Sequence, residues 1–96
     1  KNKANLISVD FNKLLFPLKL RNVKNGDYFF PIGMVGKKKV VKYLKDKKIN
    51  YVDKFNKLIL VNGDNEIIWV VGMRLDRRFS VSGGSRKIID IKIDND

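Results

Sequence analysis

The chain has 96 residues, which is enough for one small domain with a single core. It contains no cysteine and no histidine, which excludes a disulfide framework, a thiolate metal site and the commonest general base. Its 21 basic and 10 acidic residues give a formal net charge of +11, so we expect a polyanionic partner, with nucleic acid ahead of an acidic membrane surface.

The first segment of the chain predicts strands. Ile7, Val9 and Phe11 alternate with polar residues, which is the period of a half-buried strand. A second apolar segment follows at residues 14–20. Because proline cannot donate to a strand ladder, Pro17 limits that segment to an edge strand or a bulge.

The middle of the chain predicts a turn, a short extended segment and a helix. Asn25-Gly26-Asp27 is a turn signal, and we expect the aromatic residues 28–30 after it to pack on the core rather than stack on bases. Gly33 and Gly36 predict a flexible loop before a helix over residues 37–48. Its buried stripe would hold Val40, Val41, Tyr43 and Leu44, and its opposite face Lys38, Lys42 and Lys45.

The last third of the chain predicts a hairpin and a final strand. Residues 58–61 and 66–71, the second of which is apolar after Glu66, are two arms joined by an Asn-Gly-Asp-Asn turn, which indicates two central strands buried on both faces, with Trp69 in the core. In residues 85–94 the inward positions are Ile89, Ile91 and Ile93. Six or seven short strands and one helix make a small α+β domain with mostly antiparallel sheet.

The excess of basic residues is not explained by codon usage alone. An AT-rich genome would raise lysine and glutamate together, whereas Glu66 is the only glutamate in the chain. No apolar run approaches the roughly 18 residues that span a bilayer, and no signal peptide opens the chain. We therefore expect a cytoplasmic location, and we expect the chain to be a piece of a larger protein.

The motifs that could carry catalysis are weak. Ser82-Gly83-Gly84-Ser85 resembles the phosphate loop of ATP pyrophosphatases, but it lacks the aspartate and the following helix, so we interpret it as a plain turn. The carboxylates show no spacing that would pair two on one surface, as in Asp46, Asp53, Asp64 and Asp76. We expect no catalytic residue and no metal site in this chain.

The start of the predicted helix is the strongest candidate site. Lysines in a first helical turn oppose the helix dipole, at a cost of about 0.3–1 kcal/mol each, and a bound phosphate would reverse that cost. We expect phosphate contacts from basic residues, with Gly33 and Gly36 allowing close backbone approach. These basic residues are Lys37, Lys38, Lys39 and Lys42, joined by Arg74, Arg77 and Arg78. The alternative is a solvated lysine face.

One stretch is more specific than composition. Residues 21–40, RNVKNGDYFFPIGMVGKKKV, resemble the signature of the C-terminal domain of tRNA(Ile)-lysidine synthetase, in which Gly-Asp, an aromatic residue and Pro-x-Gly-Met-x-Gly precede a basic pair. The resemblance continues through residues 67–74 and 76–81 and covers about residues 16–93. The chain departs from the family at Asn50, where proline is common, and at Lys54, where arginine is usual.

This resemblance implies that the chain, residues 1–96, is one C-terminal tRNA-recognition domain without its N-terminal catalytic domain. The parent would be an ATP-dependent ligase that converts the wobble cytidine of the CAU-anticodon isoleucine tRNA to lysidine, with ATP and magnesium held in the missing domain. This fragment would have no catalysis and no cofactor. It would bind the tRNA acceptor stem and its own catalytic domain, with a β-sandwich-like fold similar to a domain of the phenylalanyl-tRNA synthetase β subunit.

Three other functions compete with this one. The main alternative is a structural or dimerisation module, weakly homodimeric, with an incidental basic surface. A membrane-surface module is disfavoured because the helix is short and faces the core. A stand-alone enzyme is opposed by the absence of histidine and cysteine.

Overall fold

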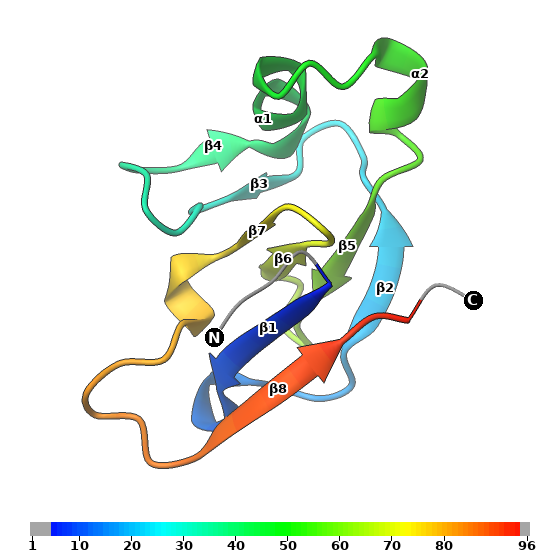
Figure 1. Ribbon diagram of the computed structural model, residues 1–96. Coiled ribbons are helices and arrows are strands. Elements are labelled where there is room, and N and C mark those ends of the chain that lie inside the picture. The colour runs from blue at the N-terminus through cyan, green and yellow to red at the C-terminus, as the bar shows by residue number, and fades with distance from the viewer. Residues whose placement is uncertain (1–4, 95–96) are drawn as a thin grey trace.

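The computed structural model describes residues 5–94. Its centre is a four-stranded antiparallel sheet in the order β2-β5-β6-β7 (Figure 1). The strands are β2 (Lys19–Asn22), β5 (Leu58–Val61), β6 (Ile67–Val70) and β7 (Arg74–Leu75). The predicted hairpin is confirmed, and its two arms are the two inner strands of the sheet.

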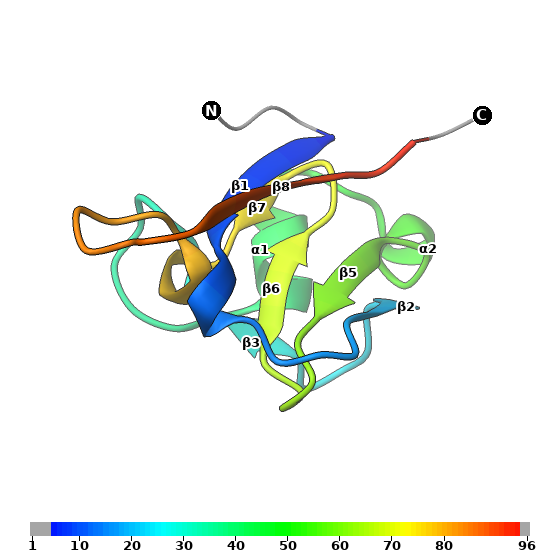
Figure 2. The same ribbon diagram turned by 90° about the horizontal axis from the view of Figure 1, so that it is seen from below.

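A second, two-stranded sheet covers one face of the first. It pairs β1 (Leu6–Asp10) with β8 (Ile88–Lys92) in antiparallel register, and Figure 2 shows this ladder lying across β6 and β7. The predicted inward residues of β8 are confirmed, because Ile89 and Ile91 are half-buried while Asp90 is exposed. The two sheets enclose Ile7, Val9, Leu60, Ile68, Trp69 and Phe79.

The other face of the central sheet is covered by α1 (Val40–Asp46) and by the short ladder of β3 (Tyr28–Phe29) and β4 (Lys38–Lys39) (Figure 1). The second core cluster lies here and contains Val40, Tyr43, Leu44, Phe29, Ile59, Val61, Ile67 and Val70. Both β5 and β6 supply residues to both clusters, which is why both strands are apolar throughout.

The predicted helix start is wrong. The helix begins at Val40 rather than Lys37, because Lys38 and Lys39 pair with the β3 residues Phe29 and Tyr28. Tertiary pairing has overridden a local helical pattern here. The helix ends at Asp46, before Lys48, whose positive φ of 64° lies outside the helical range.

Two further segments differ from expectation. A second helix, α2 (Tyr51–Lys54), was not predicted, although the Asn50 side chain caps it by accepting a hydrogen bond from the Asp53 amide. Residues 14–18 are a linker rather than a strand, and only β2 extends from them as an edge strand. None of the helices within residues 5–94 has the length and apolar character needed to cross a membrane.

The linker is held to the β5–β6 turn by close backbone packing. The Gly63 amide donates to the Leu15 carbonyl at 2.6 Å. A Cβ atom on Gly63 would lie 2.5 Å from that same oxygen, so a side chain at this position would force the linker to move. Two 3-10 turns, η1 (Phe11–Lys13) and η2 (Arg77–Phe79), complete the fold.

Candidate nucleic-acid interface

A groove lined by lysines runs between α1 and the turn that precedes β3. It has a volume of about 460 Å³ and is lined by Asn25, Gly26, Lys39, Val41, Lys42 and Lys45. We call it the lysine groove. In the described part of the chain, Lys39 and Lys45 form no ion pair, and Lys42 reaches Asp46 only at 3.8 Å in an exposed pair. Such a concentration of uncompensated charge is suited to phosphate oxygens.

A row of alternating cations and aromatic rings adjoins the groove. The Lys37 ammonium lies 4.6 Å from the centre of the Tyr28 ring, and the Tyr28 ring meets Phe30 edge-on at 6.2 Å. The guanidiniums of Arg77 and Arg78 lie 5.2 and 4.4 Å from the Phe30 ring centre. The fold thus connects the predicted lysines to two of the predicted arginines through exposed or half-buried rings.

Arg74 and Arg78 are engaged inside the protein. Arg74 donates to the Ile32 carbonyl at 3.0 Å and to the Tyr43 hydroxyl at 3.2 Å. Arg78 donates two hydrogen bonds to the fully buried Asp76 carboxylate and lies 3.2 Å from Glu66. Burial alone would lower the pKa of Arg78, but its bond to Asp76 and the charges of both carboxylates raise it above the ordinary value.

Arg77 is the most exposed of the three arginines and bonds the loop that carries the two predicted glycines. Its guanidinium donates to the Met34 carbonyl at 3.2 Å. Gly33 and Gly36 both adopt positive φ, of 79° and 75°, which favours glycine whatever lies nearby. A Cβ on Gly36 would contact nothing within 4 Å. Backbone conformation therefore accounts for these glycines, and their close approach to RNA stays a prediction.

The predicted convergence of three lysines on a helix N-terminus is wrong. In an antiparallel ladder, paired residues share a face, so Lys39 lies with exposed Tyr28, whereas Lys38 lies with buried Phe29. The Val40 amide already donates to the Asp27 carbonyl. The cationic site is thus the lysine groove, to which α1 contributes the side chains of Val41, Lys42 and Lys45.

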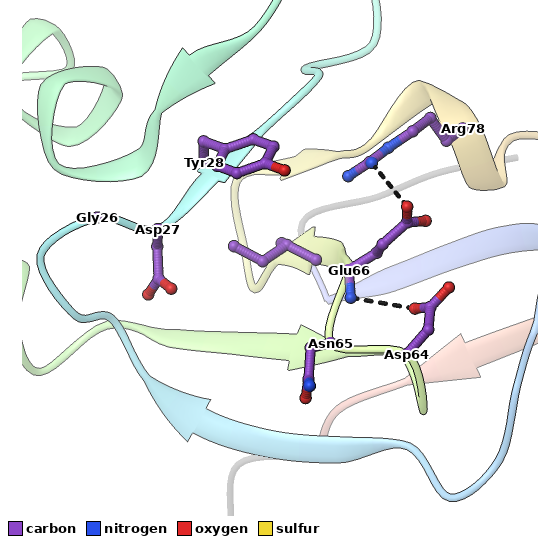
Figure 3. A pocket seen from close by; sticks show the side chains of 8 residues that line it. Gly26, Asp27, Tyr28, Asp64, Asn65, Glu66 and Arg78 are labelled. Atoms are coloured by element: carbon purple, nitrogen blue, oxygen red, sulfur yellow. Dashed lines mark hydrogen bonds and ion pairs between the residues drawn. The ribbon is translucent and has the colours of Figure 1, made fainter.

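A second hollow lies on the other side of the 25–27 turn (Figure 3). It has a volume of about 340 Å³ and is lined by Gly26, Asp27, Tyr28, Asp64, Asn65, Glu66, Ile67 and Arg78. We call it the Tyr28 pocket. Three carboxylates line this pocket, those of Asp27, Asp64 and Glu66, although of the four scattered aspartates named from the sequence only Asp64 is among them. Residues 5–94 nevertheless contain no group of three or more acidic side chains that could hold a metal ion.

The predictions for the 82–85 turn and for Trp69 are confirmed, and the one for the aromatic residues 28–30 is confirmed only in part. Residues 82–85 form a turn in which the Ser85 amide bonds the Ser82 carbonyl, and Trp69 is 1% exposed in the core. Of the three aromatic residues at 28–30, Phe29 packs in the core as expected, whereas Tyr28 is 46% exposed. Tyr28 therefore remains available for stacking.

Lys45, Asn25 and Glu66 belong to the two hollows although the sequence did not single them out as site residues. Lys45 could have been predicted from the sequence, because it lies on the same helix face as Lys42. Asn25 and Glu66 could not, because they reach the two hollows only through the packing of the 25–27 turn against α1 and the β5–β6 hairpin.

Comparison with known proteins identifies relatives across nearly the whole chain, although no family model matches it. The chain is 42% identical over 89 residues to tRNA(Ile)-lysidine synthase of Parabacteroides distasonis, which is 93% of this chain and 20% of that protein. It is 37% identical over 84 residues to tRNA(Ile)-lysidine synthase of Bacteroides thetaiotaomicron, covering 88% of this chain and again 20% of the relative. The chain therefore spans about a fifth of the length of these relatives.

Two solved structures share the fold. A crystal structure of the TILS C-terminal domain superposes with a TM-score of 0.77 at 20% identity, covering 99% of this chain and 75% of that chain. An N-terminal fragment of the phenylalanyl-tRNA synthetase β subunit from Pyrococcus horikoshii superposes with a TM-score of 0.69 at 14% identity, over 90% of this chain and 26% of that one. The expected fold is confirmed. By the sequence that it shares with its relatives along nearly its full length, and by this fold, the chain belongs to the tRNA(Ile)-lysidine synthase family, as its C-terminal domain.

Proposed function

We propose that this domain binds the acceptor stem of isoleucine tRNA for a tRNA(Ile)-lysidine synthase and performs no catalysis itself. The ligase chemistry on the wobble cytidine, with its ATP and magnesium, would belong to the catalytic domain of the parent protein, to which this domain would be attached. The relatives carry the lysidine synthase name over a length about five times that of this chain, which supports that division.

The lysine groove is the observation that carries the proposal. Three lysines from β4 and α1 line one hollow, and two of them have no counter-charge within the described residues. A-form RNA hides its base edges in a deep groove, so proteins hold it mainly through phosphates and 2′-hydroxyls. Flexible ammonium groups around an open hollow suit that contact, since they can follow a curved backbone.

The basic residues differ in how free their side chains are to contact RNA. Lys39 and Lys42 line the groove, and Lys37 lies beside it over Tyr28. Arg77 extends the cationic surface beyond Phe30. Arg74, Arg78 and half-buried Lys38 would contribute positive potential more than direct bonds, because their surroundings within the protein already constrain them.

A charge-swap titration tests the proposal. The RNA is a hairpin copy of the isoleucine tRNA acceptor stem, measured by fluorescence anisotropy at two salt concentrations. Lys39→Glu with Lys45→Glu should weaken binding at least tenfold and lower the salt slope by about 0.7–0.9 for each phosphate that is no longer neutralised. Lys87→Glu with Lys92→Glu changes net charge equally, but those residues lie at or beside β8, on the other face of the central sheet.

The outcomes separate the candidate functions. Equal losses of RNA affinity in both double variants would mean that the RNA responds to the overall positive charge of the domain rather than to a specific site. If a methionine-tRNA stem binds as tightly as the isoleucine stem, the phosphate contacts would stand, but this domain would not distinguish the two acceptor stems. If neither stem binds at low salt, the domain is a structural or dimerisation module, which mass measurements over a concentration series would then examine.

A further inference from the structure

The Tyr28 pocket combines an aromatic wall with an apolar floor and polar rims. Figure 3 shows the Tyr28 ring at one side, with its hydroxyl directed toward Arg78, and the side chains of Glu66 and Asp64 opposite it. Ile67, which is 3% exposed, is the apolar residue that lines the pocket with them. A planar ligand could therefore contact the ring on its face while its edge meets carboxylate oxygens.

Not all the polar atoms of the pocket are committed to the fold. Both oxygens of Asp27 accept bonds from Arg21, and one also accepts from the Lys24 amide. In contrast, among the bonds within residues 5–94 Asp64 uses only one oxygen, for the Asn62 side chain and the Glu66 amide. Glu66 meets Arg78 through one oxygen and is otherwise exposed. Two acceptor oxygens in the pocket thus remain for a ligand that donates.

The position of the pocket indicates the class of ligand. It shares Gly26 with the lysine groove, so the two hollows lie on either side of one turn. A chain of nucleotides lying across the turn would place phosphates among lysines and one base beside Tyr28. Bases of single-stranded segments stack on exposed aromatic side chains and are read by hydrogen bonds along their edges.

We propose that the Tyr28 pocket binds one unpaired nucleobase of the RNA, and that it prefers guanine. This rests on the proposed RNA-binding function. The Watson–Crick edge of guanine presents two adjacent N–H donors, N1–H and N2–H₂, which match acceptor-only carboxylates. Uracil presents one donor between two carbonyl oxygens, which the carboxylates of Asp64 and Glu66 would repel. Tyr28 supplies the stacking surface, and Lys37 lies over its ring.

The test compares a blunt RNA hairpin with the same hairpin carrying one unpaired 3′ guanine or uracil. The unpaired guanine should raise affinity roughly tenfold over the blunt hairpin, within the range that base–aromatic stacking supplies. Tyr28→Leu should abolish that gain, whereas Tyr28→Phe should keep it. Glu66→Gln should reduce the preference for guanine over uracil and leave blunt-hairpin binding in place.

A matched control comes from the second helix. Tyr51 is 72% exposed and has a lysine, Lys54, over its ring at 5.7 Å, but it lies on α2, outside the residues of the pocket. Tyr51→Leu should leave the guanine gain unchanged. Unfolding curves for all four variants ensure that folded protein is compared.

Each outcome bears on a different claim. A blunt hairpin that binds through the lysine groove, without any gain from the unpaired base, overturns the Tyr28 pocket and leaves the proposed function standing. An equal gain for guanine and uracil that Tyr28→Leu removes supports stacking but overturns the guanine preference. If no RNA binds at any salt concentration, both proposals are overturned.

Discussion

The lysine groove and the arginine segment around β7 carry charges of the same sign but use them differently. Lys39 and Lys45 have no ion-pair partner in residues 5–94. Arg74 donates to a backbone carbonyl and a hydroxyl, and Arg78 donates to a buried carboxylate. The net charge of the chain is therefore larger than the charge available to bind an anionic partner, because some of the basic side chains stabilise the fold instead.

Side-chain chemistry explains this division. The planar guanidinium offers five donors in a fixed fork, so it can hold a loop carbonyl and a carboxylate at once. The ammonium is a compact, strongly hydrated charge on a flexible stem, so it costs little to leave in water until a phosphate arrives. Variants on the arginine side should therefore affect stability, and those on the lysine side RNA affinity.

The largest effect is expected at Asp76, which is fully buried and accepts bonds from Arg78 and from the amides of Phe30 and Arg78. Asp76→Ala would leave these donors unpaired and should lower the free energy of unfolding by about 3 kcal/mol. Urea unfolding measures this change. Asp46→Ala is the control, since it removes only an exposed pair and should cost under about 0.5 kcal/mol. Equal costs would contradict the structural role of the arginine segment.

A smaller loss is expected from Arg74→Met. It removes the bonds to Ile32 and Tyr43 and should cost about 2 kcal/mol, since hydrogen bonds to charged groups are worth about 1.5–3 kcal/mol. RNA affinity of the folded variant should fall less than twofold. A large loss of affinity at unchanged stability would instead make Arg74 a direct RNA contact.

The pair of Arg21 and Asp27 should give a pH-dependent effect. Burial alone would raise the pKa of Asp27, but hydrogen bonds from Arg21 and from the Lys24 amide, together with the charges of both residues, lower it. An acid with a lowered folded pKa stabilises the fold above its unfolded pKa, near 3.9, and that stability is lost as the pH falls through the folded value. Asp27→Asn should thus destabilise the protein at pH 7, and the difference from wild type should vanish in acid. A difference that persists at low pH would assign the role of Asp27 to something other than its charge.

The smallest effect on stability is expected on the lysine side. Lys39→Ala and Lys45→Ala should each change the free energy of unfolding by under about 0.5 kcal/mol, because neither side chain has an ion-pair partner among the described residues. The same substitutions should weaken RNA binding severalfold. Destabilisation above about 1 kcal/mol by either would erase the contrast between the two regions.

The sequence pattern predicted the structure correctly in segments where a single periodicity of apolar residues dominates. The β5–β6 hairpin, the burial of Trp69 and the alternation of β8 all follow from local residue order. The start of α1 does not, since Lys38 joins β4 only because β3 lies beside it. Helix α2 could have been found from Asn50 and Asp53, an N-cap residue with an acid three positions later.

The candidate site was predictable only in part. The basic residues could be identified from the sequence, but the exposure of Tyr28 and the grouping of these residues into two hollows could not. Lys45 and Asn25 line the same groove, and Glu66 and Tyr28 line the same pocket, although each pair comes from segments distant in the chain. No periodicity within one element encodes such contacts.

The pairing of β1 with β8 has a consequence for synthesis on the ribosome. Because the first and last strands of the fold are partners, β1 emerges from the ribosome long before β8 exists. Until then, Ile7 and Val9 lack the strand that helps to shelter them. The face of the central sheet that carries α1 can form earlier, so we expect co-translational folding to begin there, with the β1–β8 layer added last.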